Sequence, residues 1–292
     1  MGQFAPIGRN LNGKRLRSNK RRCCHQARGG DNVAKLRIAV DLAALEEPFK
    51  EALQTARELG ADAVELEAKG ELAPGQLSRT GIREIRHWLE DFGLRLAAVR
   101  FRTPLGYDTP EELDWRIAKT KSAMEMAYHL GAPVVVNHVG RVPEDEKSDR
   151  WKLLFEVLTD LAAYANRAGA ILAAETGTEP AERLANLFHR LPEGLIGITL
   201  NPGALRISGY SPEQAAAVLG RWVVHVHATD AAGDLLDYRG NLVPLGLGAV
   251  DWLQLLAQLE EWNYRGYFCV SCPPGCEPRE EMKRAIGFLR GL

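Results

Sequence analysis

Short apolar runs alternate with longer segments of helical periodicity along residues 35–292. The runs have the length and composition of buried strands, and glycines end several of the helical segments. The predicted strands are 35–42, 61–68, 94–101, 133–140, 171–177, 196–203, 222–230 and 266–272. The predicted helices are 48–59, 82–92, 111–130, 151–168, 180–190, 212–219, 251–262 and 279–292. Eight strand–helix units joined by right-handed crossovers predict a parallel (β/α)8 barrel of the α/β class.

An open, doubly wound sheet is the alternative arrangement of the same units. No G-x-G-x-x-G motif follows the first predicted strand, so the nucleotide-binding form of that fold has no support. The patterned region also has the length of one barrel domain, which typically takes about 250 residues. We therefore expect a single barrel domain over residues 34–292.

The first 33 residues differ from the rest of the chain. Residues 1–30 hold eight of the 37 basic side chains and no acidic one. They also lack hydrophobic periodicity, so we expect a disordered basic arm at residues 1–33. The pair Arg21 and Arg22 is not followed by an apolar segment, which argues against a twin-arginine export signal. The sequence leaves the role of this arm open.

The composition of the chain limits the binding partners and the cell compartment that we expect. Beyond the arm, 29 basic side chains face 38 acidic ones, and an acidic body argues against broad binding to nucleic acid. No apolar run approaches the roughly 18 residues of a membrane span, so we expect no membrane segment. The five cysteines do not form a disulfide framework, which favours the reducing cytoplasm. Cys269, Cys272 and Cys276 have a zinc-like spacing, but strand alternation turns the first away from the second, so we expect ordinary thiols.

Polar side chains stand at the ends of several predicted strands. Glu175 follows the apolar run ILAA, Asn201 follows IGITL, and His227 lies near the end of WVVHVHATD. The carboxyl ends of parallel barrel strands meet at one face, where active sites are built. We therefore expect Glu175, Asn201 and His227 to converge on one pocket.

Five further polar residues are candidates for the same pocket. His138 ends the fourth strand, and we expect it to contact substrate or another site residue. His225 lies one layer deeper on the seventh strand and either contacts substrate or packs in the interior. Glu65, on the second strand, is either a polar group at the base of the pocket or part of a buried ion pair. Asp230 and Asp234, after the seventh strand, are acids that could compensate for a missing carboxylate.

Several motifs occur in an order that resembles a known family. They are GADAVELEA, ILAAETG, LNPG, VHVHATDAAGD and the final run VPLGLGAVDW to GYFCVSC. Together they resemble the xylose isomerase-like TIM barrels of the sugar phosphate isomerase/epimerase group over residues 35–292. The resemblance implies a divalent cation (Mn, Mg, Zn or Co) held by a Glu, an Asp, a His and a second Glu from strands five to eight. It also implies two carboxylates that move protons on opposite sides of a sugar.

The chain departs from this pattern at half of the ligand positions. Glu175 and His227 match the family, whereas Asn201 stands at the Asp position and Ser271 at the second Glu position. Two other polar positions of the family are apolar here, at Ala204 and Leu247. The remaining metal set is Glu175, Asn201 and His227, and fewer charged ligands predict weak metal binding. Ser271 also leaves one side of the proton shuttle with no evident titratable group.

These observations lead to two functional hypotheses. The first is a cytoplasmic sugar isomerase or epimerase that acts on, or binds, a small polyhydroxylated carbonyl compound through Glu175 and His227. The second is a non-catalytic barrel that binds a sugar-like ligand or a protein partner. The endonuclease branch of the same superfamily would need more metal ligands and a basic cleft. Substrate identity, catalytic activity and oligomeric state are left open.

Overall fold

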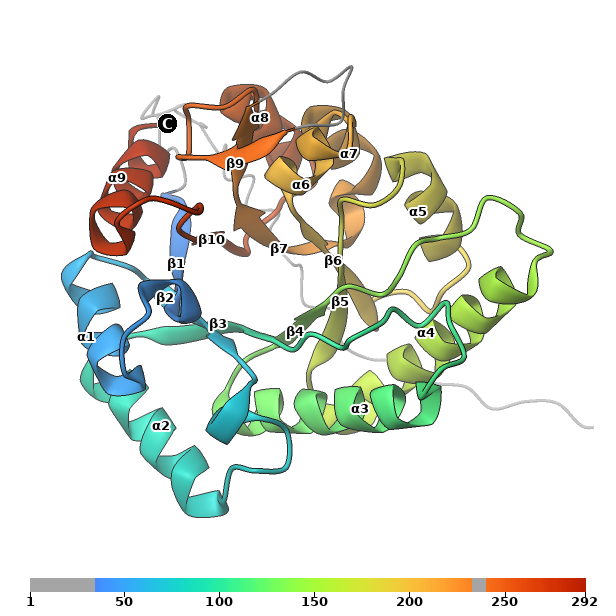
Figure 1. Ribbon diagram of the computed structural model, residues 1–292, viewed down its shortest axis with the longest axis horizontal. Coiled ribbons are helices and arrows are strands. Elements are labelled where there is room, and N and C mark those ends of the chain that lie inside the picture. The colour runs from blue at the N-terminus through green and yellow to red at the C-terminus, as the bar shows by residue number, and fades with distance from the viewer. Residues whose placement is uncertain (1–34, 233–239) are drawn as a thin grey trace, which may run out of the picture. The chain divides into compact units, whose positions relative to one another are not determined.

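Eight parallel strands form a closed barrel in the computed structural model, which describes residues 35–232 and 240–292 (Figure 1). The strands are β1 (Arg37–Asp41), β2 (Ala63–Glu67), β3 (Arg95–Arg100), β4 (Val134–Asn137), β5 (Ile171–Glu175), β6 (Ile196–Leu200), β7 (Val223–Ala228) and β10 (Tyr267–Val270). Their order around the barrel is β1-β10-β7-β6-β5-β4-β3-β2. The predicted barrel is thereby confirmed. The predicted arm at residues 1–33 and the candidate Asp234 lie outside the described residues.

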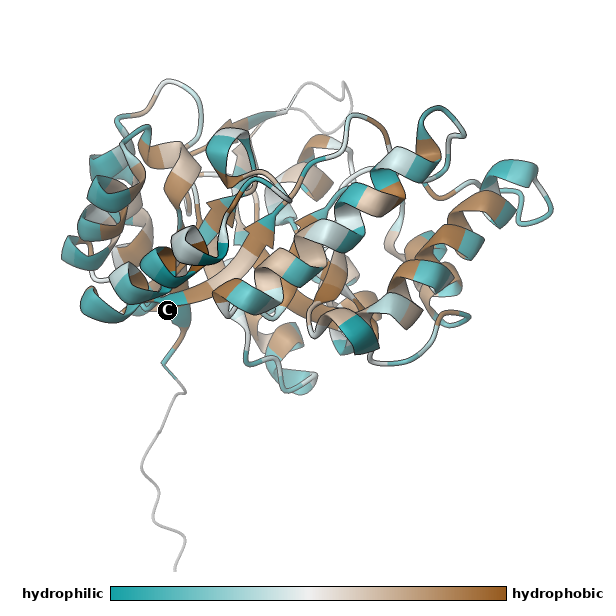
Figure 2. Cartoon of the chain, turned by 90° about the horizontal axis from the view of Figure 1, so that it is seen from below, coloured by the Kyte–Doolittle hydropathy of each residue, from teal (hydrophilic) through white to brown (hydrophobic). Residues whose placement is uncertain are grey.

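Helices surround this barrel and turn their apolar sides toward it (Figures 1 and 2). They are α1 (Phe49–Glu58), α2 (Arg79–Asp91), α3 (Leu113–Leu130), α4 (Asp149–Ala168), α5 (Ala181–Phe188), α6 (Pro202–Ile207), α7 (Pro212–Leu219), α8 (Trp252–Glu261) and α9 (Pro278–Gly291). Gly131 and Gly169 end α3 and α4 in the left-handed conformation that glycine adopts without strain. Within the described ranges, no helix has the length and apolar content needed to cross a membrane.

The region after β7 is more structured than its sequence pattern predicts. The predicted strand 222–230 ends early, at Ala228. Between this strand and the predicted helix 251–262, β8 (Asp230–Ala232) and β9 (Asn241–Val243) form a two-stranded antiparallel sheet. The predicted strand 196–203 also ends early, at Leu200, and the unpredicted helix α6 begins at Pro202. A helix of six residues is too short to show periodicity.

A shift of register on β3 decides which of its side chains face the barrel interior. Ala97 is skipped in the pairing with β2. Ala97 and Ala98 both pack among interior side chains, whereas Val99 packs with the helix-facing core. Alternation resumes after this point, so Arg100 at the end of the strand faces inward.

A second register shift has the same effect on β7. Val224 is skipped in the pairing with β6. Val224 packs against the interior cluster and Val226 belongs to the helix-facing core. His225 and His227 therefore both face the interior, where they contact Glu65 of β2.

Candidate active site

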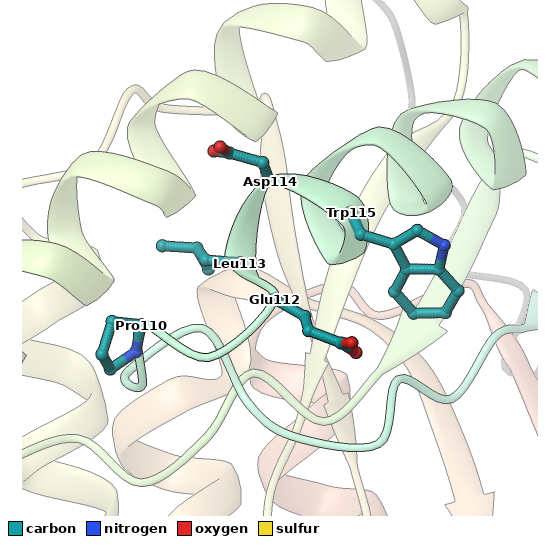
Figure 3. A pocket seen from close by; sticks show the side chains of 5 residues that line it. All are labelled: Pro110, Glu112, Leu113, Asp114 and Trp115. Atoms are coloured by element: carbon teal, nitrogen blue, oxygen red, sulfur yellow. The ribbon is translucent and has the colours of Figure 1, made fainter.

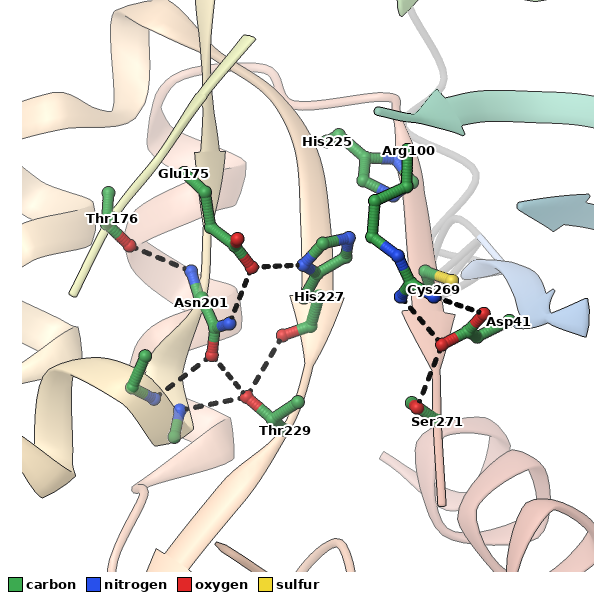
Figure 4. A network of polar contacts seen from close by, with 12 residues as sticks. Asp41, Arg100, Glu175, Thr176, Asn201, His225, His227, Thr229, Cys269 and Ser271 are labelled. Carbon is green, nitrogen blue, oxygen red and sulfur yellow. Dashed lines mark hydrogen bonds and ion pairs between the residues drawn. The ribbon is translucent and has the colours of Figure 1, made fainter. Parts of the chain in front are cut away.

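Glu175, His227 and Glu65 form a connected group inside the barrel (Figure 4 shows Glu175 and His227). Nδ1 of His227 lies 2.7 Å from Oε1 of Glu175. Nε2 of the same ring lies 2.9 Å from Oε2 of Glu65. The imidazole of His227 is therefore held between two carboxylates that come from β5 and β2. Because each ring nitrogen faces a carboxylate oxygen, both nitrogens donate when the ring is protonated.

Asn201 joins this group through its amide nitrogen. Nδ2 of Asn201 donates to Oε1 of Glu175 over 2.8 Å. Its amide oxygen accepts from the backbone N–H of Ala204 at 3.0 Å and from the hydroxyl of Thr229 at 2.6 Å. Asn201 is therefore the N-cap of α6. The predicted convergence of Glu175, Asn201 and His227 is present, but the oxygen of Asn201 is engaged away from Glu175.

His225 lies deeper in the interior and is almost fully buried. Its Nε2 lies 2.9 Å from Oε2 of Glu65, and its Nδ1 has no hydrogen-bond partner among the described residues. Burial lowers the pKa of His225, although the carboxylate of Glu65 partly opposes the effect. The ring is therefore neutral. Both readings of Glu65 hold together, since it is a polar group at the base of the pocket and a member of a buried ion pair.

Two other predicted site residues make their contacts outside this group. Nε2 of His138 lies 2.9 Å from the carbonyl oxygen of Thr103 in the β3–α3 loop. Asp230 is buried, and its carboxylate accepts from five N–H groups, those of the backbone of Ala231, Gly246, Gly248 and Val250 and of the Trp252 indole. Asp230 therefore organises the segment from Gly246 to Trp252 and does not supply a carboxylate to the pocket.

The structure adds Arg100 and Asp41, which the sequence patterns did not reveal (Figure 4). Nη1 and Nη2 of Arg100 lie 2.7 and 3.1 Å from the two carboxylate oxygens of Asp41. The hydroxyl of Ser271 donates to Oδ2 of Asp41 over 3.1 Å. The prediction that the Ser271 side of the pocket lacks a titratable group was therefore wrong. Asp41 fills that side, but its charge is balanced by Arg100.

These two residues stand where the other candidates stand, at the carboxyl ends of strands. Asp41 ends KLRIAVD and Arg100 ends LRLAAVR. Applying the strand-end rule to every strand, and not only to the later ones, would have found Asp41. Arg100 would have remained uncertain in orientation, because its inward direction depends on the skipped Ala97.

Electrostatics couples Glu175 to His227. Burial alone would raise the pKa of Glu175, but the charge and hydrogen bond of His227 outweigh it and lower the pKa to about 2. Burial alone would lower the pKa of His227, but the charges of Glu65 and Glu175 raise it to about 10. At neutral pH the two residues therefore form an ion pair of carboxylate and imidazolium.

The whole cluster is close to charge balance. Three carboxylates, Asp41, Glu65 and Glu175, face two cations, Arg100 and the protonated His227. For Glu65, which is completely buried, burial raises the pKa, but the two histidines hold the pKa well below its usual range. Buried carboxylates of this kind persist only when they are paired and hydrogen-bonded.

A surface hollow of about 670 Å³ lies elsewhere, at the start of α3 (Figure 3). It is lined by Pro110, Glu112, Leu113, Asp114 and Trp115. None of these side chains belongs to the polar cluster. The chemistry of the barrel interior therefore defines the candidate site better than the size of this surface hollow does.

A family model described as a xylose isomerase-like TIM barrel matches residues 53–292. The chain belongs to this family. The expected resemblance is confirmed, and the polar cluster lies at the barrel end where such proteins build their sites. A comparison with curated proteins found no match.

Solved structures share the fold of this xylose isomerase-like barrel. A xylose isomerase domain protein from Planctomyces limnophilus has 23% identity and a TM-score of 0.78, over 88% of this chain and 97% of that one. The IOLI protein with a binding zinc atom has 18% identity and a TM-score of 0.72, over 87% and 96%. A D-psicose 3-epimerase in the presence of D-fructose has 16% identity and a TM-score of 0.70, over 88% and 99%. At these identities the likeness establishes the fold alone.

One set of side chains in this xylose isomerase-like barrel could bind a metal ion. Donor atoms of Glu65, His225 and His227 lie within 4.8 Å of one another. Two imidazoles and one carboxylate suit zinc and other transition metals. The charge does not fit, however, because Nη1 of Arg100 stands 3.3 Å from Oε1 of Glu65. The other oxygen of Glu65 already contacts both histidines. The set fits a metal by ligand type and spacing but not by charge.

Proposed function

We propose that this barrel is a sugar isomerase or epimerase that binds a small polyhydroxylated carbonyl compound at the carboxyl end of its strands. The observation that carries the proposal is the 2.7 Å contact between Glu175 and His227, which two separate strands bring together inside the barrel. Family membership supports it. So does the shared fold with a D-psicose 3-epimerase, which is a sugar-converting enzyme by its description.

The reaction requires a base, an acid and a positive charge near a carbonyl group. In this proposal the carboxylate of Glu175 removes the proton beside the carbonyl carbon, which leaves an enediolate. The imidazolium of His227 stabilises the enediolate oxygen through its N–H. The proton now held by Glu175 returns to one of the two enediolate carbons, which restores the Glu175 carboxylate and completes the exchange. The low pKa of Glu175 makes it a weak base in the free protein. A sugar hydroxyl between Glu175 and His227 would break their contact and raise the pKa of Glu175 toward its ordinary value.

A second function is favoured by the pair that faces this group. Asp41 lies on the far side of the pocket, but its two oxygens are held by Arg100. Both oxygens of Asp41 already accept hydrogen bonds, from Arg100 and from Ser271, so this carboxylate is held by its own neighbours and is not free to act on a ligand. On that observation the barrel binds a sugar-like ligand without converting it.

Exchange of substrate protons with deuterated water separates these two functions. Each member of a ketose panel is incubated with the protein in deuterium oxide, and deuterium beside the carbonyl is measured by mass spectrometry. The proposal expects incorporation for at least one ketose and a loss of about 100-fold or more in Glu175→Gln. Glu84→Gln, at an exposed position on α2, should match the unmodified protein.

A different pattern supports binding without conversion. In that case no ketose gains deuterium, while one of them still raises the melting temperature in a concentration-dependent way. If neither exchange nor a thermal shift occurs with any ketose or aldose, both functions are rejected.

A further inference from the structure

Arg100 is buried among acidic side chains at the end of β3. Only 12% of its side chain is exposed. Its guanidinium contacts both oxygens of Asp41, as described above, and Nη1 also lies 3.3 Å from Oε1 of Glu65. A third carboxylate, that of Glu67, lies 3.9 Å from Nη2. A single cation is therefore shared by carboxylates from β1 and β2.

The backbone geometry of β3 places the guanidinium of Arg100 among these carboxylates. The skipped residue on β3 turns Arg100 inward. Ser271, which directly follows β10, leaves room for the guanidinium beside Asp41. A glutamate at position 271 would reach further into the same space than serine does. The short side chain of Ser271 therefore leaves the space that the guanidinium of Arg100 occupies.

We propose that the guanidinium of Arg100 takes the place of a bound divalent cation in this barrel. It neutralises Asp41 and Glu65, and it supplies the positive charge that an electron-rich sugar oxygen meets in the pocket. The proposal rests on the proposed function only for the identity of that ligand. The site is then metal-independent, although its neighbouring side chains are of types that bind metals.

Charge and hydrogen-bonding capacity support this assignment. An arginine stays protonated at every physiological pH, so its charge is permanent. A divalent ion bound to Glu65 would lie close to that charge and be repelled. Among the described residues, Oε1 of Glu65 and Nε of Arg100 have no hydrogen-bond partner. Ligand hydroxyl groups, which both donate and accept, suit such a pair of orphaned atoms.

Metal titration tests the proposal without any substrate. Purified protein is treated with EDTA, dialysed and titrated with Mn²⁺ and with Zn²⁺ by calorimetry, and its metal content before treatment is measured by elemental analysis. The proposal expects no stoichiometric metal before treatment and no binding tighter than about millimolar. One tightly bound, EDTA-removable ion per chain would overturn it, whatever the behaviour of any variant.

Variants at position 100 separate charge from shape. Arg100→Met leaves Asp41 and Glu65 uncompensated and should bind Mn²⁺ at least about tenfold more tightly than the unmodified protein. Arg100→Lys keeps the charge and should not gain affinity. Arg95→Gln removes an exposed arginine at the opposite end of β3 and serves as the control. A folded Arg100→Met protein with no gain in affinity would contradict the proposal.

The two proposals can fail separately. Deuterium exchange that survives EDTA supports both of them. Exchange that EDTA abolishes and Mn²⁺ restores supports the enzymatic function and overturns the role of Arg100. Absence of exchange together with weak metal binding leaves Arg100 as the cation of a binding site, and rejects catalysis.

Discussion

Glu175 and Glu179 lie close together in the chain, but their pKa values are shifted in opposite directions. Burial raises the pKa of both carboxyl groups. At Glu175 the imidazolium of His227 reverses the effect, and the pKa falls to about 2. Within residues 35–232 and 240–292, no cationic side chain forms an ion pair with Glu179. Hydrogen bonds from Thr178 and from the backbone of Val142 offset only part of the burial, so its pKa rises to about 7.

Glu179 therefore makes the barrel less stable as pH rises. Between pH 4.5 and 7 the native carboxyl keeps a proton that the unfolded chain has lost, so the free energy of unfolding falls across this window and stays lower above it. The full effect is at most about 3 kcal/mol. Glu179→Gln should stabilise the protein at pH 8 and change little at pH 4.5, as measured by urea unfolding at both pH values.

The matched control for this prediction is an exposed glutamate. Glu182→Gln, in the first turn of α5, should leave the pH dependence of unfolding as it is in the unmodified protein. A Glu179→Gln protein that keeps the full pH dependence between 4.5 and 7 would show that another group is responsible.

At the scale of elements, one carboxylate fixes the segment from Gly246 to Trp252, which leads into α8. Asp230 accepts four backbone N–H groups and one indole N–H, as described above. Gly248 is required by the same contact, since a Cβ at this position would lie 2.0 Å from Oδ1 of Asp230. Gly246 is required for a different reason, its positive φ of 80° and its close approach to the ring of Phe288.

Removing this carboxylate should loosen the connection and the barrel together. Asp230→Ala leaves several buried N–H groups without partners, and we expect a loss of about 3–5 kcal/mol in the free energy of unfolding. Asp114→Ala, at an exposed position on α3, should change it by less than about 0.5 kcal/mol. Urea unfolding monitored by circular dichroism measures both. A loss below 1 kcal/mol in Asp230→Ala would mean that water replaces the carboxylate.

How much of the site could be predicted from the sequence also depends on its elements. Strand ends were recognisable from apolar runs, so Glu175, Asn201 and His227 could be placed at one end of the barrel. The pairing of Arg100 with Asp41 could not be predicted. Simple alternation along β3 would turn Arg100 toward the helices, and only the skipped residue, which depends on pairing with β2, turns it inward.

The same limit applies to the partners of each group. A sequence shows that Asn201 replaces an acid, but not that its amide oxygen caps α6 while its nitrogen reaches Glu175. Hydrogen-bond partners between distant strands follow from register and rotamer, which packing of the complete barrel determines. The fold was therefore predictable in outline. For the site, the sequence could predict which residues come together but not which contacts they make.

At the scale of the whole molecule, the barrel closes between the first and the last strand of the described chain. β1 pairs with β10 along Arg37–Val40 and Tyr267–Val270. The side of β10 that faces outward is covered by α9, whose Met282, Ala285, Ile286 and Leu289 are buried. Until β10 is in place, β1 and β7 are open edges, which are prone to aggregation.

A chain that ends at Trp262 lacks β10 and α9 and should fail to form the barrel. We expect loss of cooperative thermal unfolding and aggregation in size-exclusion chromatography, since both exposed edges remain unpaired. A chain lacking residues 1–33 loses a segment of similar length that precedes every described strand. It should keep the melting temperature of the full protein within about 2 °C. A soluble, cooperatively unfolding chain without β10 would contradict the prediction.

The placement of Arg100 has a consequence for how the protein would work in a cell. A cation that belongs to the polypeptide is present in every folded molecule, with no loading step and no competition among the metal ions of its surroundings. Shortage of manganese or zinc would leave such a barrel in working order, and an excess of copper could not displace its charge. The disadvantage is that the strength of the interaction between this cation and the ligand is fixed. A guanidinium cannot be replaced by a stronger Lewis acid when conditions change.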